Sequence, residues 1–172
     1  KRIRDEILAG LAPRIAALPR KPGLAVVLVG DNPASQVYVG SKVKTCLELG
    51  MHSEKITPAA SISTEELLSL IATLNARDEI DGILVQMPLP KHIDSERVLD
   101  AIAPEKDVDG LHPFNIGSLA LKRHSPYFVS CTPLGVVRIL EEVLGSKEAI
   151  AGKRVLIIGR SNIVGQPLYL LL

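Results

Sequence analysis

The chain has 172 residues, 47% of them hydrophobic, so it can bury the core of one domain and part of another. Its formal net charge of +1 gives no sign of a nucleic-acid or membrane partner, and no run of about 18 apolar residues predicts a membrane span. The four histidines lack metal-ligand spacing and the two cysteines form no C-x-x-C pair, so we expect no metal and reduced thiols in a cytoplasmic protein.

The first half of the chain alternates between helix and strand patterns. A helical pattern opens the chain and is expected to end at Pro19. The continuous apolar run 24–29 predicts a strand buried on both faces, as in a parallel sheet. A helix over 33–50 and a second strand over 53–60 are expected to follow.

The second half begins with another helix and a third strand. Ser63 and Glu66 have the spacing of a capping box, which predicts a helix start. The further expected elements are a strand over 80–85, a helix over 95–102, a loop-rich segment over 103–133, a helix over 134–144, a strand over 155–158 and a helix after the Gly159 turn. Cys46 is predicted in a helix and Cys131 in a loop. This alternation predicts an α/β fold with a mainly parallel sheet.

Tyr38 and Lys42 share one face of the predicted helix, because residues four apart lie one turn above the other. They follow a buried strand, at the edge where open α/β sheets bind ligands. We expect both at the border of the buried face, where a lysine held partly out of water can do proton chemistry. The alternative is an exposed lysine beside a partly buried tyrosine.

Three other segments place polar or glycine residues beside predicted elements. The turn 85–90, with Pro88 and Pro90, can place Gln86 accurately, or it only ends a strand. In 104–110, two aspartates could bind a metal or an aminopyrimidine edge, or form a polar turn.

The third segment, Gly159–Gly165, follows a strand pattern and opens a helix, as a dinucleotide-binding loop does. It departs from G-x-G-x-x-G, since Ser161 replaces the second glycine and the last glycine falls one residue late. Arg160 would add charge for a phosphate or would face water.

Together, in order and over essentially the whole chain, these segments resemble the bifunctional methylenetetrahydrofolate dehydrogenase/cyclohydrolase family (the bacterial FolD type). The resemblance is carried by P-G-L-A-V-V-L-V-G-D-N-P-A-S-Q-V-Y-V-x-x-K, D-G-I-L-V-Q-M-P-L-P, P-E-K-D-V-D-G, C-T-P and G-R-S-N-I-V-G-Q-P. Ser130 departs from it, because most relatives read P-C-T-P there, a change that we expect to be tolerated.

The resemblance implies a catalytic, folate-binding domain over 1–134 and the opening of a Rossmann-type NAD(P)-binding domain over 135–172, which would continue further. The implied catalytic set is Lys42, Tyr38, Gln86 and Asp109. The implied folate contacts are Tyr38, Gln86, Leu89, Pro90 and Asp109, with Tyr38 stacking on the folate and Asp109 gripping the pterin. The implied NADP phosphate loop contains Gly159, Arg160, Ser161 and Gly165.

The implied activity is oxidation of 5,10-methylenetetrahydrofolate by NADP, with NAD as the alternative cofactor, and hydrolysis of the product to 10-formyltetrahydrofolate. Lys42 would carry protons in the hydrolysis. The expected partners are the small folate substrate and a second copy in a homodimer. Two other hypotheses stay open. One is a short-chain dehydrogenase, although its glycine loop should precede the Tyr-Lys pair, and the other is a non-catalytic folate-binding fragment.

Overall fold

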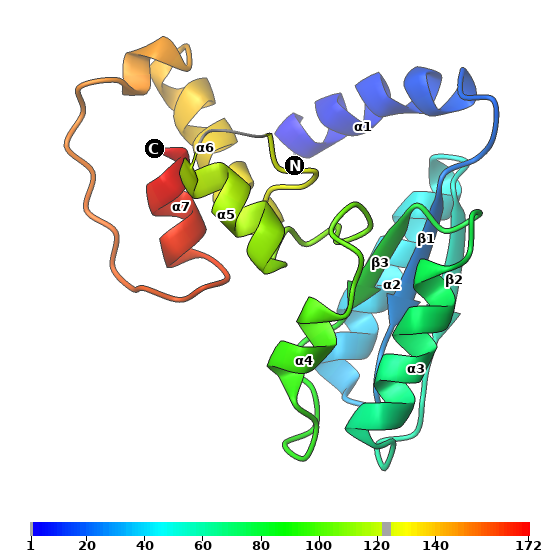
Figure 1. Cartoon of the computed structure of the whole chain (residues 1–172). Helices are drawn as coiled ribbons and strands as arrows, with labels where there is room; N and C mark the ends of the chain where they lie inside the picture. The colour runs from blue at the N-terminus through cyan, green and yellow to red at the C-terminus, as the bar shows by residue number, and fades with distance from the viewer. Residues whose placement is uncertain (1, 122–124) are drawn as a thin grey trace. The chain divides into compact units, whose positions relative to one another are not determined.

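The computed structural model describes residues 2–121 and 125–172 (Figure 1). The chain divides into two compact units, Lys1–Lys106 and Asp107–Leu172. This division concerns packing, and the functional boundary expected after Leu134 stays a prediction. Within the described ranges, no helix is both long and apolar enough to cross a membrane.

The first unit consists of alternating helices and strands. Its elements are α1 (Arg2–Ala16), β1 (Gly23–Val27), α2 (Pro33–Glu48), β2 (His52–Ile56), α3 (Thr64–Asn75), β3 (Gly82–Val85) and α4 (Ser95–Asp100). The prediction of alternating elements is confirmed, although several bounds differ: α1 ends three residues before Pro19, and β2 ends at Ile56 rather than near residue 60. The capping box is confirmed, since Ser63 Oγ accepts from Glu66 N and Glu66 Oε2 accepts from Ser63 N.

The three described strands form a parallel sheet in the order β2-β1-β3. Central β1 pairs with β2 from Gly23↔His52 onward and with β3 from Leu24↔Gly82 onward. All of β3 and most of β1 is buried, which explains their unbroken apolar sequences. The α/β fold class with a parallel sheet is therefore confirmed.

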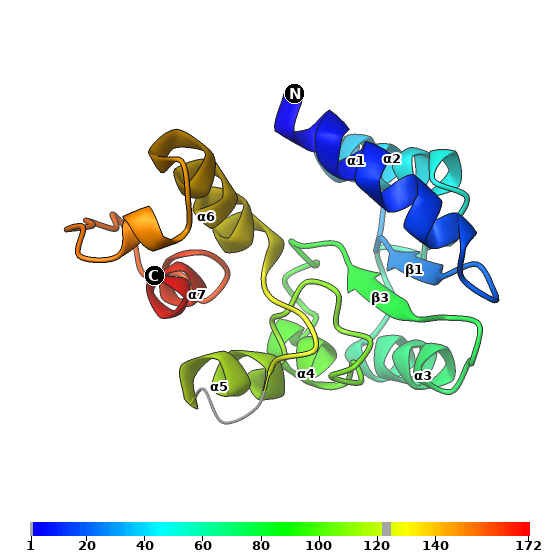
Figure 2. The same ribbon diagram turned by 90° about the horizontal axis from the view of Figure 1, so that it is seen from above.

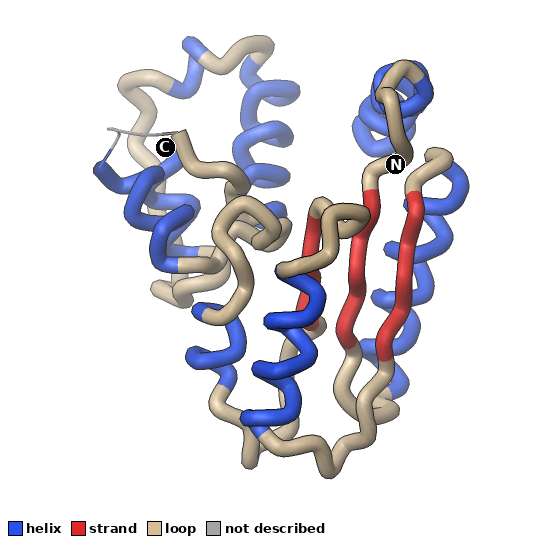
Figure 3. Tube along the Cα trace, turned by 45° about the vertical axis from the view of Figure 1, so that its right-hand side comes forward, coloured by secondary structure: helices blue, strands red, loops and turns tan. Residues whose placement is uncertain are grey.

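Helices cover both faces of this sheet. Helix α2 lies on one face, while α3 and α4 lie on the other (Figure 2; Figure 3). The chain passes from β1 to β2 on one side and then crosses to β3 on the other side of β1. The carboxyl ends of β1 and β3 therefore flank a topological switch point, the usual ligand position in open α/β sheets.

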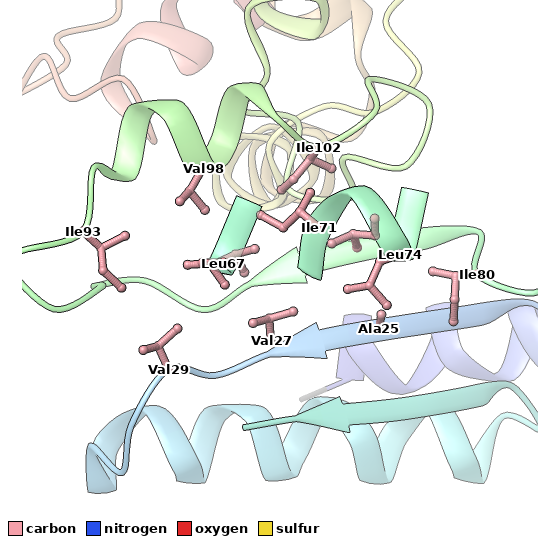
Figure 4. Close-up of a cluster of buried hydrophobic side chains, with 12 residues drawn as sticks. Ala25, Val27, Val29, Leu67, Ile71, Leu74, Ile80, Ile93, Val98 and Ile102 are labelled. Carbon is pink, nitrogen blue, oxygen red and sulfur yellow. The ribbon is translucent and has the colours of Figure 1, made fainter. Parts of the chain in front are cut away.

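The core of the first unit lies between the sheet and α3 (Figure 4). Leu67, Ile71 and Leu74 recur at helical spacing on α3 and meet Ala25 and Val27 of β1. Each fully buried side chain of this size contributes about 1.5–3 kcal/mol through removal from water. This packing holds the carboxyl ends of β1 and β3 in place beside the switch point.

The second unit consists of helices and connecting segments. Its elements are α5 (Pro113–Leu121), α6 (Cys131–Leu144), a 3₁₀ turn over Glu148–Ile150 and α7 (Gly165–Leu171). The segment 103–133 was expected to be loop-rich, and helix α5 within it was not predicted; it begins with a proline, which is favoured at the first position of a helix. Cys131 was also wrongly predicted in a loop, because α6 begins three residues earlier than expected and includes Pro133 in its first turn.

Residues 155–158, predicted as a strand, form none. A strand needs the N–H and C=O groups of a neighbouring strand, and no described segment of the second unit forms one. Leu156 and Ile158 are accordingly 85% and 94% exposed. The apolar pattern was present, but the pairing partner that turns such a pattern into a strand was not.

Candidate functional site

The turn after β1 sets the start of α2. Gly30 has a φ of +76°, which glycine adopts at little cost, and the side chain of Asn32 accepts a hydrogen bond from Ser35 N at 3.2 Å. Pro33 occupies the first helical position. The helix that carries Tyr38 and Lys42 is therefore anchored at the carboxyl end of the central strand.

Lys42 and Gln86 are joined by a hydrogen bond from Lys42 Nζ to Gln86 Oε1 at 3.3 Å. Gln86 directly follows β3, and its backbone N donates to Val27 O at 2.8 Å, which extends the ladder beyond the strand. Its side-chain nitrogen donates to Met87 O at 2.8 Å. A carbonyl can only accept, so this contact fixes the amide with its oxygen facing the ammonium of Lys42.

The prediction that both side chains lie at the border of the buried face is confirmed for Lys42 and wrong for Tyr38. Lys42 is half-buried, whereas Tyr38 is 67% exposed. Helix α2 rests on the sheet through Val39, which is fully buried, and the adjacent position lies about 100° round the helix. That rotation carries the Tyr38 ring beyond the contact with the sheet, where its face is accessible to a flat ligand.

The proline turn after β3 continues from Gln86. The Met87–Pro88 bond is cis, and Leu89 and Pro90 are half-buried. Leu89 packs against the hydrophobic core, and Pro90 O accepts from Ile93 N at 3.0 Å. The structure thus places Gln86, Leu89 and Pro90 on one compact turn of the first unit.

Asp107, the first of the two aspartates in the second unit, is buried and hydrogen-bonded within its own loop. It is 2% exposed, and its Oδ2 accepts from His112 N at 2.8 Å and from Asn115 Nδ2 at 2.9 Å. Asn115 is buried as well and accepts from Tyr127 N at 3.0 Å. A buried carboxylate needs such donors, so Asp107 holds its own loop together, while Asp109 is half-buried.

Sequence reasoning missed Asn115, since a single buried asparagine produces no periodic signal.

In the part of the chain that the structure describes, no three His, Cys, Asp or Glu side chains are grouped so that they could hold a metal ion.

The glycine loop of the second unit turns sharply before α7. Gly159 has a φ of +119°, and a Cβ on Gly165 would lie 2.6 Å from Gly159 O. Ser161 Oγ accepts from Val164 N at 3.1 Å and from Gly165 N at 3.4 Å. Both glycines and the serine are therefore required by the shape of the loop itself.

A pocket of about 260 Å³ opens beside this loop. It is lined by Ile157, Gly159, Arg160, Gly165, Gln166 and Tyr169. Gln166 and Tyr169 were not predicted, although Tyr169 lies four residues after Gly165 and thus on the same side of α7. Glycine backbone, one arginine and one aromatic ring are suited to a phosphate-bearing nucleotide.

Two domain families match this chain. Residues 1–109 match the tetrahydrofolate dehydrogenase/cyclohydrolase catalytic domain, and residues 130–172 match the NAD(P)-binding domain of the same enzymes. A curated relative, the bifunctional protein FolD of Solibacter usitatus, is 55% identical over 99% of this chain and 55% of its own length. Another from Dechloromonas aromatica is 52% identical over 100% of this chain and 60% of its own length.

Solved structures agree with these matches. The bifunctional FolD enzyme of Campylobacter jejuni has a TM-score of 0.93 and 45% identity over 99% of this chain and 60% of that one. A Trypanosoma brucei methylenetetrahydrofolate dehydrogenase-cyclohydrolase, solved with NADP and an inhibitor, has a TM-score of 0.90 and 34% identity, covering 99% of this chain and 58% of that one.

Fold and matches together define an α/β protein in which a catalytic domain precedes a NAD(P)-binding domain. The chain belongs to the tetrahydrofolate dehydrogenase/cyclohydrolase family. It spans 55% and 60% of the length of the two curated relatives named above.

Proposed function

We propose that this protein oxidises 5,10-methylenetetrahydrofolate to 5,10-methenyltetrahydrofolate and hydrolyses that product to 10-formyltetrahydrofolate. The observation that carries the proposal is the hydrogen bond from Lys42 Nζ to Gln86 Oε1, which lies beyond the carboxyl ends of the parallel strands. The residues that form it lie within 1–109, which match the catalytic domain. A half-buried amine whose position is fixed by a hydrogen bond is suited to proton transfer with a bound substrate.

The hydrolysis is the step that needs proton transfers. Water attacks the methenyl carbon and loses a proton, and the ring nitrogen gains one as the carbon–nitrogen bond breaks. Lys42 would accept the first proton and return it to the departing nitrogen. Gln86 would orient the amine, and the exposed ring of Tyr38 would stack on the folate.

Folate binding would also involve Asp109 and the turn that carries Leu89 and Pro90. A carboxylate can accept two parallel N–H bonds, which matches the aminopyrimidine edge of a pterin. The family resemblance implies this role for Asp109, while Asp107 Oδ2 accepts from His112 and Asn115 within its own loop.

The loop with Gly159, Arg160, Ser161 and Gly165 would hold the phosphates of NADP. Space is open where a Cβ on Gly159 would lie, which allows close approach of a diphosphate to the backbone there, while the missing side chain of Gly165 lets the loop pack on itself. NADP is bound in the related Trypanosoma brucei structure. Bound NADP would supply the acceptor for the hydride that leaves the methylene carbon. The lone pair of the folate nitrogen stabilises the resulting cation, so the residues of this chain act in that step mainly by positioning the substrate.

The proposal extends to the functional boundary after Leu134, a homodimer, a cytoplasmic location and a supply of one-carbon units for purine synthesis. These follow from the family resemblance alone.

Replacement of Lys42 by methionine tests the hydrolytic role. We expect hydrolysis of 5,10-methenyltetrahydrofolate to fall by roughly 10²-fold or more, with tetrahydrofolate still bound. Lys44→Met is the matched control, since Lys44 lies on the same helix and is exposed. Hydrolysis at the wild-type rate in Lys42→Met would refute the assignment.

A further inference from the structure

Ser130 is the residue before α6, in the N-cap position, yet its side chain makes no hydrogen bond to its own helix. A serine there usually accepts from a backbone N–H of the first turn. Instead, Ser130 Oγ donates to Ile163 O at 3.0 Å, 33 residues further along the chain. Ser130 is 4% exposed, so this is a buried contact between two segments of the second unit.

Ile163 lies inside the glycine loop that would hold the cofactor phosphates. Other hydrogen bonds that shape this loop are local, from Val164 N and Gly165 N to Ser161 Oγ and from Gln166 N to Ser161 O. The Ser130 contact differs because it ties the loop to a separate segment. It therefore fixes where the loop sits as well as how it is folded.

The other neighbour of Ser130 is the turn that carries Asp109. Gly110 closes this turn with a hydrogen bond from its N to Asp107 O at 3.1 Å and has a φ of +64°. A Cβ on Gly110 would lie 2.7 Å from Ser130 N, so the turn packs directly on the Ser130 backbone. Cys131 Sγ also contacts Val108 O at 3.9 Å.

We propose that Ser130 is a positioning residue that joins the cofactor loop to the Asp109 turn, its hydroxyl holding Ile163 and its backbone supporting Gly110. The inference rests on the proposed function, since it assigns that loop to NADP and that turn to folate. It predicts that binding of NADP and binding of tetrahydrofolate strengthen each other through Ser130.

The test compares three replacements of Ser130 in the intact protein. Alanine removes the hydroxyl, proline removes it while its fixed φ suits the observed −51°, and threonine keeps it. Dissociation constants for NADP are measured with and without tetrahydrofolate by calorimetry. Ser118→Ala is the control, because Ser118 is also buried in the second unit but lies outside these contacts.

In the wild type, tetrahydrofolate is expected to tighten NADP binding severalfold. Ser130→Ala and Ser130→Pro should bind NADP roughly 2- to 10-fold more weakly and lose this coupling, whereas Ser130→Thr should retain both. A purely structural role would lower the melting temperature of the alanine variant and leave the coupling intact, which would overturn the inference. Wild-type NADP affinity in Ser130→Ala, or a wild type without coupling, would also overturn it. A wild type that binds no NADP refutes the proposed function itself.

Discussion

Gln86 presents its amide oxygen to Lys42 because its amide nitrogen is already bound to the Met87 carbonyl, 2.8 Å away. The two residues are 44 positions apart, and the sheet brings them together: α2 follows β1, Gln86 follows β3, and β1 pairs with β3. The acceptor is neutral and its orientation is set by the backbone. This hydrogen bond therefore holds the Lys42 amine in place through a neutral partner.

Replacement of Gln86 by leucine should slow hydrolysis more than it weakens folate binding. Leucine has a similar size but cannot accept from Lys42, so the amine would lose its orientation. We expect kcat for hydrolysis of 5,10-methenyltetrahydrofolate to fall roughly 10- to 100-fold with a nearly unchanged KM, because misplacement of a catalytic group by about 1 Å has effects of this size. Steady-state kinetics give both constants, and an unchanged kcat would show that the hydrogen bond has no part in the reaction.

Gly165→Ala should disturb the glycine loop. The added Cβ would meet Gly159 O at 2.6 Å and Arg160 Cα at 3.0 Å, and both are backbone atoms that move only with the loop. We expect NADP affinity, measured by calorimetry on the intact protein, to fall roughly tenfold or more, because phosphate contacts depend on backbone position.

Gly135→Ala is the matched control for that change. Gly135 lies in α6 with no atom within 4 Å of the added Cβ, so alanine there should leave NADP binding intact and raise stability by about 0.5–1 kcal/mol. Equal NADP affinity in both alanine variants would mean that the Gly159–Gly165 loop does not hold the cofactor.

Local patterns in the sequence were sufficient for the elements of the first unit. The apolar run at β1 and the capping box at Ser63 each depend on neighbours within a few residues, and each predicted its element. The structure also joins Lys42 and Gln86, two members of the implied catalytic set, by a hydrogen bond.

Features that depend on distant parts of the chain were not predictable in the same way. The exposure of Tyr38 is set by which flank of α2 rests on the sheet. The strand expected at 155–158 requires a partner strand, which apolar periodicity does not supply. Asn115 and the hydroxyl of Ser130 act through hydrogen bonds with residues 8 to 33 positions away, and no spacing rule detects these.

Acid should weaken the first unit partly through Asp81. Arg20 donates to both carboxylate oxygens of Asp81, at 2.6 and 2.7 Å, and Gly23 N donates to Oδ2 at 2.8 Å. The hydrogen bonds from the Arg20 guanidinium are the main cause that lowers the pKa of Asp81. A carboxyl whose pKa is lower in the folded state stabilises the fold above its ordinary pKa, and this contribution is lost as the pH falls through the lowered value.

Asp81→Asn tests this contribution because asparagine keeps an acceptor for Gly23 but carries no charge for Arg20. At neutral pH the variant should melt at a slightly lower temperature, a small effect because Arg20 and Asp81 are about half exposed and screened by salt. The difference from wild type should shrink as the pH falls below about 4. Glu105→Gln, which removes an exposed carboxylate of the same unit, is the control. A difference that is the same at neutral and acid pH, or insensitive to salt, would show that the charge of Asp81 is not what stabilises the fold.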